Sequence, residues 1–545
     1  ESLRELWGDS GWSPGQCAIG SVKSTVGHLL TGAGAAAVAK VLQAIKAGGL
    51  PPQANFTTAA TGLRYEDGPF RVLTRPEMWR RRPGRTPRRA AVSGFGFGGV
   101  NAHLLLEEWS PPLAKQAVSV SPSPSRNLPP PAIAVVGLAA HFGTWDDTRK
   151  FQEHVLAGDA ATAIPKKNGW GLAPRSSAPG FGIEELRLPI DRFRIPPKEL
   201  EETLPQQLLM LKVAAAALDD SGLAARTDDP TTGAFIGLGL DPNTMNYNLR
   251  WSALAQESGI GSPESALRKR SLASSVSTPD SRLLTPDSSS PPLSANRVMG
   301  ALGSIAASRI ARAFHFGGPF HTVCSEEASS ARAIELGVRA LQLGELDCAL
   351  VGGVDLASDP RIVIPGDVKL PGEGAAAFVL KLLADAERDG DRVYAIIRGV
   401  GAADNPDAAM TRASADAGAD FANAVTFDAT PDVGETGAAA AAASLAKGCI
   451  ALWQQILPGK PPRYWLHDRV EGPRRASITA AGADGSHLAI LLEEQAKAAE
   501  DLTPIAARSQ PLGAREEAVF VAEGNGPSEL IGKLQRLTAF AGEHK

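Results

Sequence analysis

Lys23-Ser-Thr-Val-Gly-His28 leads into a run of small residues that ends at Lys40, and the chain repeats this stretch far downstream. The second version reads Thr430-Pro-Asp-Val-Gly-Glu435 and leads into a similar run that ends at Lys447. The separation is 407 residues throughout, so that Lys23 corresponds to Thr430 and His28 to Glu435. This repeat predicts a duplicated domain.

Each copy continues to a glycine-rich segment, an apolar run and a pair of glutamates. The first copy reads Gly94-Phe-Gly-Phe-Gly-Gly-Val-Asn-Ala-His103 before its glutamates, and the second reads His487-Leu-Ala489-Ile-Leu-Leu before Glu493 and Glu494. Aligned on the glutamate pair, His103 corresponds to Ala489. The pattern indicates that both copies keep their scaffold and that only the first keeps its chemistry.

Bulk composition excludes several classes of protein. A length of 545 residues favours about three to four domains. The net charge of −4 and the pI near 6.2 argue against a nucleic-acid partner. The longest apolar run, 438–443 with its neighbours, is far shorter than the ~20 residues that a membrane span needs.

The cysteines point to a reducing compartment. The four of them are scattered singly, which predicts neither a disulfide framework nor a metal site. A cytoplasmic location is therefore expected. The four are Cys17, Cys324, Cys348 and Cys449.

Composition along the chain predicts four regions. Residues 1–110 are interpreted as the end of one domain, 111–130 as a stiff Pro/Ser linker, and 131–495 as a complete second domain. Residues 496–545 fit a linker and the start of a next domain, such as an acyltransferase. The chain opens at Glu1 without Met or a signal peptide, close to a functional motif, which predicts a fragment of a longer polypeptide.

The second domain alternates predicted strands and helices. Apolar runs at 133–138, 233–239 and 347–353 predict buried strands, the first of the type found in parallel sheets. Residues 204–222 predict a helix with a glycine stop, and 529–540 an amphipathic helix. This alternation favours layered α/β sheets.

Lys23–His28 together with Asn101-Ala-His103 resembles the second half of a β-ketoacyl synthase, a condensing enzyme of the thiolase fold. The resemblance covers nearly all of residues 16–108. It implies a layered αβαβα fold, present here as one partial copy and one complete but degenerate copy. In that family a cysteine takes up an acyl chain as a thioester, and two histidines drive decarboxylation of a malonyl unit, whose carbanion attacks that thioester.

The resemblance also implies roles for residues of the first copy. His28 and His103 would donate hydrogen bonds to the enolate oxygen, for which preorganised donors suit a developing negative charge. Lys23 would orient and polarise the site near His28. Phe95 and Phe97 would form a gate beside the pocket, in the motif that includes Asn101. A histidine that only caps a turn is the alternative, against which the family spacing of both histidines and the lysine argues.

The complete copy resembles the same family but lacks its catalytic residues. Counting 25 residues back from Gly352 of a Gly-Gly pair places Glu327 at the position of the nucleophilic cysteine. With Thr430, Glu435 and Ala489 at the other sites, this domain is interpreted as catalytically degenerate.

Three other residues leave alternatives open. Cys324, three positions before Glu327, is a candidate for a shifted nucleophile, although the histidines that it would need are replaced. His487 is a candidate for a displaced catalytic histidine, the alternative being a solvent-facing loop residue. Cys348 and Cys449 lie in apolar contexts and are interpreted as core residues.

A condensing enzyme beside an inactive twin resembles the ketosynthase–chain length factor pair of polyunsaturated fatty acid synthases, which are megasynthases related to polyketide synthases. The implied activity is acyltransfer by decarboxylative Claisen condensation, with the second domain shaping the acyl tunnel. The alternatives are a degenerate module of a modular polyketide synthase and a purely structural dimerisation module.

The resemblance also implies partners. Malonyl and acyl thioesters would arrive on the phosphopantetheine of an acyl carrier protein, with no cofactor or metal bound by the chain itself. The two domain types would form a pseudo-dimer within a homodimeric parent. This chain alone is predicted to be inactive, because the acylated cysteine is not among its residues.

Overall fold

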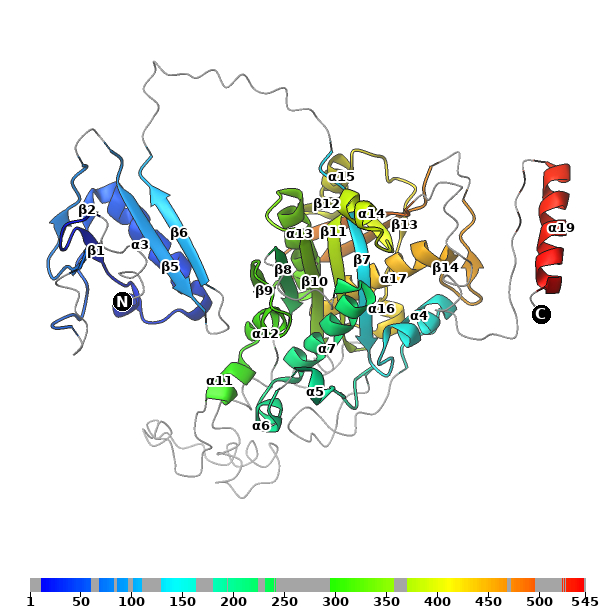
Figure 1. Cartoon of the computed structure of the whole chain (residues 1–545), viewed down its shortest axis with the longest axis horizontal. Helices are drawn as coiled ribbons and strands as arrows, with labels where there is room; N and C mark the ends of the chain where they lie inside the picture. Colours follow the sequence, from blue (N-terminus) through cyan, green and yellow to red (C-terminus); the bar gives the residue numbers. More distant parts are fainter. Residues whose placement is uncertain are drawn as a thin grey trace, which may run out of the picture. The chain divides into compact units, whose positions relative to one another are not determined.

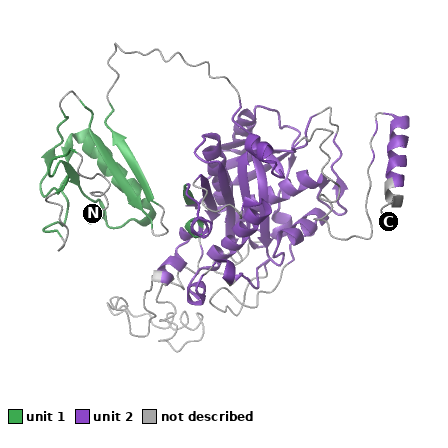
Figure 2. Ribbon diagram, viewed as in Figure 1, with its two compact units in different colours: residues 1–128, 307–309, 319–321 green, residues 129–306, 310–318, 322–545 purple. Residues whose placement is uncertain are grey.

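The computed structural model describes most of the chain as two compact units. The first comprises residues 1–128 together with 307–309 and 319–321, and the second comprises 129–306, 310–318 and 322–545 (Figure 2). The described residues are 11–59, 68–82, 86–96, 101–109, 129–162, 180–193, 195–223, 231–239, 241, 295–356, 370–467, 472–495, 522, 524 and 526–543.

The second unit is built on a nine-stranded mixed sheet (Figure 1). In spatial order its strands are β13 (Val425–Thr426), β16 (Arg475–Ala481), β17 (His487–Glu493), β12 (Ala395–Ala403), β7 (Ile133–Phe142), β11 (Glu373–Leu382), β10 (Cys348–Leu356), β8 (Thr232–Leu238) and β9 (Phe320–Val323). The parallel setting expected for β7 is wrong, because β7 runs antiparallel to both β11 and β12. All ten of its residues are nevertheless buried, since helices cover the sheet on both faces.

Helices and two short strands complete this unit. They are α4 (Thr148–Ala157), α5 (Ile190–Phe193), α6 (Pro197–Glu201), α7 (Pro205–Asp220), α11 (Ala295–Ala301), α12 (Ile305–Ala313), α13 (Ser329–Gln342), α14 (Leu383–Asp389), α15 (Pro406–Ala417), α16 (Thr430–Val433), α17 (Ala440–Gln454), α19 (Pro527–Glu543), β14 (Ile456–Leu457) and β15 (Arg463–Tyr464). Two 3₁₀ turns, η5 (Glu326–Ala328) and η6 (Gly437–Ala439), precede α13 and α17.

The sheet divides into two halves where β7 meets β12, because only three residue pairs join these strands. Helices α13 and α17 contact strands of both halves, which places them between the halves. Helix α7 packs on β7, β10 and β11, and α15 packs on β12 and β17. The layers therefore follow the order αβαβα, and the predicted layered α/β class is confirmed.

Glycines in the central strands let the helices approach both faces of the sheet. A Cβ at Gly352 would lie 3.0 Å from Met210 Cε of α7, and a Cβ at Gly353 would lie 2.5 Å from the Ser330 Cβ of α13. Neighbouring strand residues point to opposite faces, so Gly352 leaves room for α7 on one face and Gly353 for α13 on the other. On β8, a Cβ at Gly237 would lie 2.4 Å from the Ser330 amide nitrogen. No side chain fits there without moving α13.

Several predicted elements are confirmed. The predicted helix at 204–222 is α7, and the predicted strands at 233–239 and 347–353 are β8 and β10. The amphipathic helix expected at 529–540 is α19. Of the predicted linker 111–130, all but the last two residues lie outside the described residues.

The first unit repeats part of the second. Its elements are β1 (Cys17–Ile19), α2 (Lys23–Val26), η1 (Leu30–Gly32), α3 (Ala33–Ala47), β2 (Gly49–Leu50), β3 (Phe70–Val72), β4 (Glu77–Met78), β5 (Arg89–Phe95) and β6 (Asn101–Glu107). The four-residue helices α2 and α16 end at Gly27 (φ 74°, ψ −177°) and Gly434 (φ 78°, ψ −176°), a conformation that is practically restricted to glycine. Each is followed by a 3₁₀ turn and a 15-residue helix, α3 or α17.

The antiparallel hairpins β5–β6 and β16–β17 also correspond, now at a separation of 386 residues. Ser93 pairs with His103 in the first, and Thr479 pairs with Ala489 in the second. The separation changes because the connection 51–76, which includes β3, is shortened to 458–462 in the second unit.

One ion-paired clamp closes both hairpins at the base. Arg88 binds Glu108 (Nη1–Oε1, 2.5 Å) and donates to the Trp79 carbonyl, while Arg474 binds Glu494 (Nη1–Oε2, 2.7 Å) and donates to the Trp465 carbonyl. The duplicated scaffold inferred from the motifs is therefore present in the structure.

Helices that could cross a membrane are not found among the described residues, since none is both long and apolar enough.

Replacing Gly237 should test the close approach of α13. We expect Gly237→Ala to lower the free energy of unfolding of the second unit by about 1–3 kcal/mol, because the backbone of α13 must move to admit the methyl group. Urea denaturation measures the effect. Gly34→Ala on α3 is the control, since a Cβ there meets nothing within 4 Å. Equal midpoints for Gly237→Ala and the unmodified chain would contradict the prediction.

Candidate functional site

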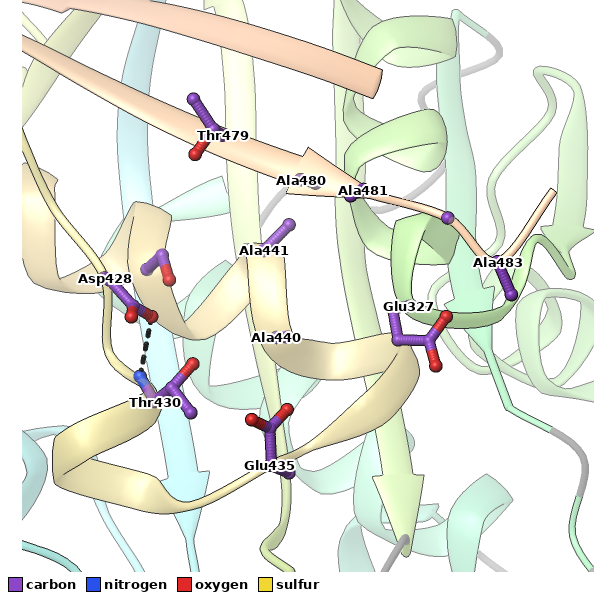
Figure 3. A pocket seen from close by; sticks show the side chains of 12 residues that line it. Glu327, Asp428, Thr430, Glu435, Ala440, Ala441, Thr479, Ala480, Ala481 and Ala483 are labelled. Carbon is purple, nitrogen blue, oxygen red and sulfur yellow. Dashed lines mark hydrogen bonds between the residues drawn. The ribbon is translucent and has the colours of Figure 1, made fainter. Parts of the chain in front are cut away.

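A pocket of about 430 Å³ lies in the second unit between η5, α16, the start of α17 and the end of β16. It brings together three of the four positions at which the sequence predicts lost catalytic residues, namely Glu327, Thr430 and Glu435. Figure 3 shows Glu327 and Glu435 near the turn that leads into α17. The other lining residues are Asp428, Ala440, Ala441, Ser444, Thr479, Ala480, Ala481, Gly482 and Ala483.

The turn that carries Glu327 joins strand β9 to helix α13. Glu326 has a φ of 49°, a left-handed conformation that costs a residue with a Cβ roughly 1–2 kcal/mol. The Ser325 amide donates to Ser329 Oγ (2.9 Å), and that hydroxyl donates to the Glu326 carbonyl (2.5 Å). These bonds hold the strained turn, which presents the exposed Glu327 to the pocket.

Backbone hydrogen bonds fix the position of Glu435. Its amide donates to the Leu370 carbonyl (2.7 Å), and its carbonyl accepts from the Gly372 amide (2.8 Å). Because Gly434 imposes the same turn as Gly27, position 435 leaves its helix as His28 does. Glutamate therefore occupies the place in this unit that histidine occupies in the first.

An ion pair supports the wall beside Thr430. Lys447 Nζ lies 2.5 Å from Asp432 Oδ2 and donates to the Asp428 carbonyl (2.9 Å). Burial is the largest influence on Asp432 and raises the pKa of its carboxyl, against the opposing effect of Lys447. The Asp428 carboxylate accepts from the Thr430 amide (2.9 Å; Figure 3). Sequence reasoning missed Asp428, whose only signal was its correspondence with Ser21.

Ala489 lies apart from the other three predicted positions. It is 1% exposed and belongs to a separate apolar cluster with Ala409 and Ala413 of α15 and with Phe421, and it does not line the pocket. Its counterpart, His103, is exposed and its Nδ1 lies 2.9 Å from Ser93 Oγ, on the neighbouring strand. The counterpart of His103 in the second unit therefore lies outside the pocket.

The end of the β16 strand contributes the residues that correspond to the predicted gate. Ala481 and Ala483 line the pocket, and they correspond to Phe95 and Phe97 at the separation of 386. Phe95 is 75% exposed and pairs with Asn101, whereas Phe97 lies outside the described residues. The second unit therefore has alanine at both positions where the first has phenylalanine.

Lys23 and His28 are both exposed in the first unit. Lys23 begins α2, and His28 follows Gly27, with its Nδ1 accepting from the Leu30 amide (3.0 Å). This bond leaves Nε2 as the ring nitrogen that carries the proton in neutral His28. Such an N–H is the donor that an oxyanion requires.

The cysteines are distributed as follows. Cys348 and Cys449 are buried, as predicted for core residues, and burial raises the pKa of the Cys449 thiol. Cys324 is exposed but is not among the residues that line the pocket. His487, at the start of β17, does not line it either. Among the described residues no group of three or more His, Cys, Asp or Glu side chains is placed to hold a metal ion.

Taken together, the second unit is a five-layer α/β domain with a pocket at a strained strand-to-helix turn, and the first unit shares its second half. Comparison with known families gives two matches. The model of the β-ketoacyl synthase N-terminal domain matches residues 131–369, and that of the β-ketoacyl synthase C-terminal domain matches residues 1–57. The chain belongs to the β-ketoacyl synthase family.

Curated relatives are large synthases. One of the polyunsaturated fatty acid synthase proteins of Thraustochytrium sp. is 28% identical over 433 residues, which are 72% of this chain and 20% of the relative. The spectinabilin polyketide synthase system protein NorA' of Streptomyces orinoci is 30% identical over 302 residues, 50% of this chain and 7% of the relative. The chain thus spans a fifth or less of the length of these two relatives.

Solved structures share the fold. The PfaC keto synthase–chain length factor has a TM-score of 0.63 at 24% identity, over 89% of this chain and 54% of that one. The ketosynthase from module 6 of the Bacillus subtilis bacillaene synthase has a TM-score of 0.51 at 20% identity, over 67% of this chain and 72% of that one. These likenesses confirm the predicted ketosynthase-type fold.

Asp355 anchors the turn that precedes the pocket helix α17. Its Oδ2 accepts from the Ala438 amide (2.8 Å), in the turn that leads into α17. Burial, together with the charges of Asp241 and Glu373, raises the pKa of this carboxyl to about 7. Since the folded chain binds this proton more tightly than the unfolded chain, the stabilisation is complete below about pH 4 and is lost as the pH rises through 7.

Asp355→Asn should remove this pH dependence. One pKa unit corresponds to about 1.4 kcal/mol, so the unmodified second unit should lose several kcal/mol more than the variant between pH 4 and pH 8. Urea denaturation at both pH values measures the difference. Asp347→Asn, at an exposed position just before β10, should behave like the unmodified chain. Identical pH profiles for all three proteins would contradict the prediction.

Proposed function

We propose that the first copy supplies the histidine side of a β-ketoacyl synthase site and that the second copy is its non-catalytic partner. The reaction is the decarboxylative condensation of a malonyl thioester with an acyl thioester. Loss of CO₂ from the malonyl unit leaves an enolate, whose carbon forms a bond to the acyl carbonyl and releases the cysteine thiolate. The enolate oxygen needs hydrogen-bond donors while it carries charge.

The observation that carries this proposal is the exchange of charge between corresponding positions. The pocket of the second copy has Asp428, Thr430 and Glu435 where the first copy has Ser21, Lys23 and His28. Ionised carboxylates only accept hydrogen bonds, and they repel a malonyl carboxylate and an enolate. The lysine ammonium donates hydrogen bonds and is positively charged, and a histidine ring N–H also donates. Together with Glu327, these carboxylates disfavour the negative charge that develops during the reaction.

We assign the enolate-binding role to His28 and a positioning role to His103. His28 corresponds to a residue that lines the pocket, whereas His103 corresponds to Ala489, which is buried in the cluster against α15. Lys23, at a position that also corresponds to a lining residue, supplies positive charge. Phe95 and Phe97 form one side of the site, at the positions of Ala481 and Ala483.

The differing burial of the two copies supports our inference that a further segment of protein completes the first. Helix α17 buries eleven of its fifteen residues, but of the fifteen residues of α3 only Ala44 is buried. Strand β17 is buried between β12 and β16, whereas β6 pairs with β5 and keeps Leu104 and Leu105 exposed. Such a segment would be equivalent to the first half of the second unit and would carry the nucleophilic cysteine.

The partner role follows the architecture of the relatives. Carrier-bound phosphopantetheine would bring both thioesters, and the second domain would pair with the completed ketosynthase and line the end of its acyl tunnel. Replacement of the phenylalanines by alanines at the pocket, with loss of every catalytic group, fits a domain that is retained for its shape.

The present chain should not accept an acyl group. Cys348 and Cys449 are buried, burial raises the pKa of Cys17, and Cys324 does not line the pocket. After incubation with radiolabelled acyl carrier protein, we expect no thioester on any of the four cysteines, as measured by autoradiography and peptide mass spectrometry. Stable label on Cys324 that disappears in Cys324→Ala would overturn this expectation.

In a synthase that contains this chain, three substitutions should separate the roles. His28→Ala should lower the elongation rate by about 100-fold or more, the typical effect of removing an oxyanion donor. His103→Ala should be milder, and Glu327→Ala should leave the rate within about twofold, because its pocket has no remaining chemistry. The formation of labelled elongated product from labelled malonyl carrier protein measures the elongation rates. Full elongation by His28→Ala, or arrest by a folded Glu327→Ala protein, would refute the assignment.

A further inference from the structure

Positive charge is concentrated in one hairpin region of the first copy. Residues 68–109 hold eight arginines and three acidic residues, whereas the corresponding residues 454–495 hold five basic and five acidic residues. The two regions have the same strands, register and clamp. The excess charge is therefore not required by the fold.

Part of this charge serves the structure. Arg81 and Arg88 both bind Glu108, at 2.9 and 2.5 Å, and Arg89 binds Glu107 at 2.6 Å. These pairs close the base of the hairpin β5–β6. They use both glutamates at the end of β6.

Arg80 and Arg82 are left without such a role. Both side chains are exposed, and neither forms an ion pair or hydrogen bond with the described residues. Their backbone is nevertheless fixed, because the Trp79 amide donates to the Gly48 carbonyl (2.8 Å) and Arg82 forms a β-bridge with Thr86. The arginine strap, residues Arg80–Arg82, therefore holds its charges on an ordered backbone.

The second copy has lost this charge together with its chemistry. At the separation of 386, Arg80, Arg81 and Arg82 correspond to Leu466, His467 and Asp468. Leu466 is 70% exposed, so the same place on the scaffold presents an apolar side chain instead of a cation. At these three positions the copy that keeps His28 has arginines, and the copy with Glu435 has none.

We propose that the arginine strap is the docking surface for an acidic acyl carrier protein at the first copy. This inference rests on the proposed function, since only a copy that performs condensation needs a carrier-borne substrate. Exposed charges of this kind raise the rate of association more than they slow dissociation, because they act on the approaching partner over about a Debye length. The strap thus recruits carrier protein to the copy that can use it.

The test is the association kinetics of the full 545-residue chain with an acidic acyl carrier protein in its phosphopantetheinylated form. At low salt, the double variant Arg80→Glu/Arg82→Glu should lower kon by about tenfold with little change in koff. The difference should vanish near 1 M salt, where the Debye length is about 3 Å. Coincident thermal melts verify that the variant is folded.

Lys198→Glu/Arg463→Glu is the matched control. Both residues are exposed in the second unit, and the two reversals change the net charge of the chain as much as the strap variant does. We expect kon within about twofold of the unmodified chain, since the effect depends on local charge. An equal loss of kon in both double variants would overturn the proposal in favour of a general charge effect.

Two further outcomes would also overturn it. One is that carrier protein does not bind the unmodified chain, and the other is that the strap variant loses heparin binding but not carrier binding, which indicates a general polyanion site. Failure of the proposed function is distinguishable, because it appears as full elongation by a synthase that carries His28→Ala. If the strap variant keeps the kon of the unmodified chain while His28 remains essential for elongation, only the docking proposal is overturned.

Discussion

Contact between the start of helix α13 and the central strands determines where the pocket residues lie. Gly237 and Gly353 leave no Cβ in the way, so that Ser330 sits directly on the sheet. Ser330 Oγ then accepts from the Ala442 amide of α17 (3.2 Å), which joins the two helices between the layers. Glu327 lies in η5, directly before α13, and Ala440 begins α17, so this contact sets both sides of the pocket. Close packing of this kind transmits small volume changes to the site.

The pocket keeps its geometry although its chemistry has changed. The strained turn at Glu326, the glycine at 434 and the hydrogen bonds of Glu435 all hold a site to which carboxylates now contribute. Electrostatics therefore distinguishes the copies better than shape does. A site that stabilises a developing oxyanion needs donors and positive charge, and three acidic side chains in the same space work against that requirement.

Comparison of the copies separates the constraints of the fold from those of function. The turns at Gly27 and Gly434 and the clamps at Arg88 and Arg474 are shared because each satisfies backbone or ionic groups that every copy of the scaffold contains. The residues that differ include those that line the pocket of the second copy, such as Thr430 and Glu435, whose counterparts are Lys23 and His28. Function in this family thus resides in positions that the scaffold leaves open to change.

Sequence patterns alone were sufficient for much of this architecture. The repeat of Lys23–His28 at Thr430–Glu435 revealed the duplication, and the apolar runs at β8 and β10 and the helix α7 lie close to their predicted bounds. Glu327, Thr430 and Glu435 were identified by spacing because short motifs keep their register over a shared turn. The predicted roles of His28, His103, Lys23, Phe95, Phe97 and Asn101 remain predictions.

Tertiary structure decided what depends on contacts between distant segments. The antiparallel setting of β7 could not be read from its apolar run, because burial on both faces by helices produces the same pattern as a parallel strand. Alignment with His103 suggested that Ala489 belonged to the pocket, but side chains alternate along a strand, and only the packing of α15 shows which neighbours that position meets. The contributions of Asp355 and Asp428 were likewise not predicted, since hydrogen bonds to backbone amides leave no periodic signal in the sequence.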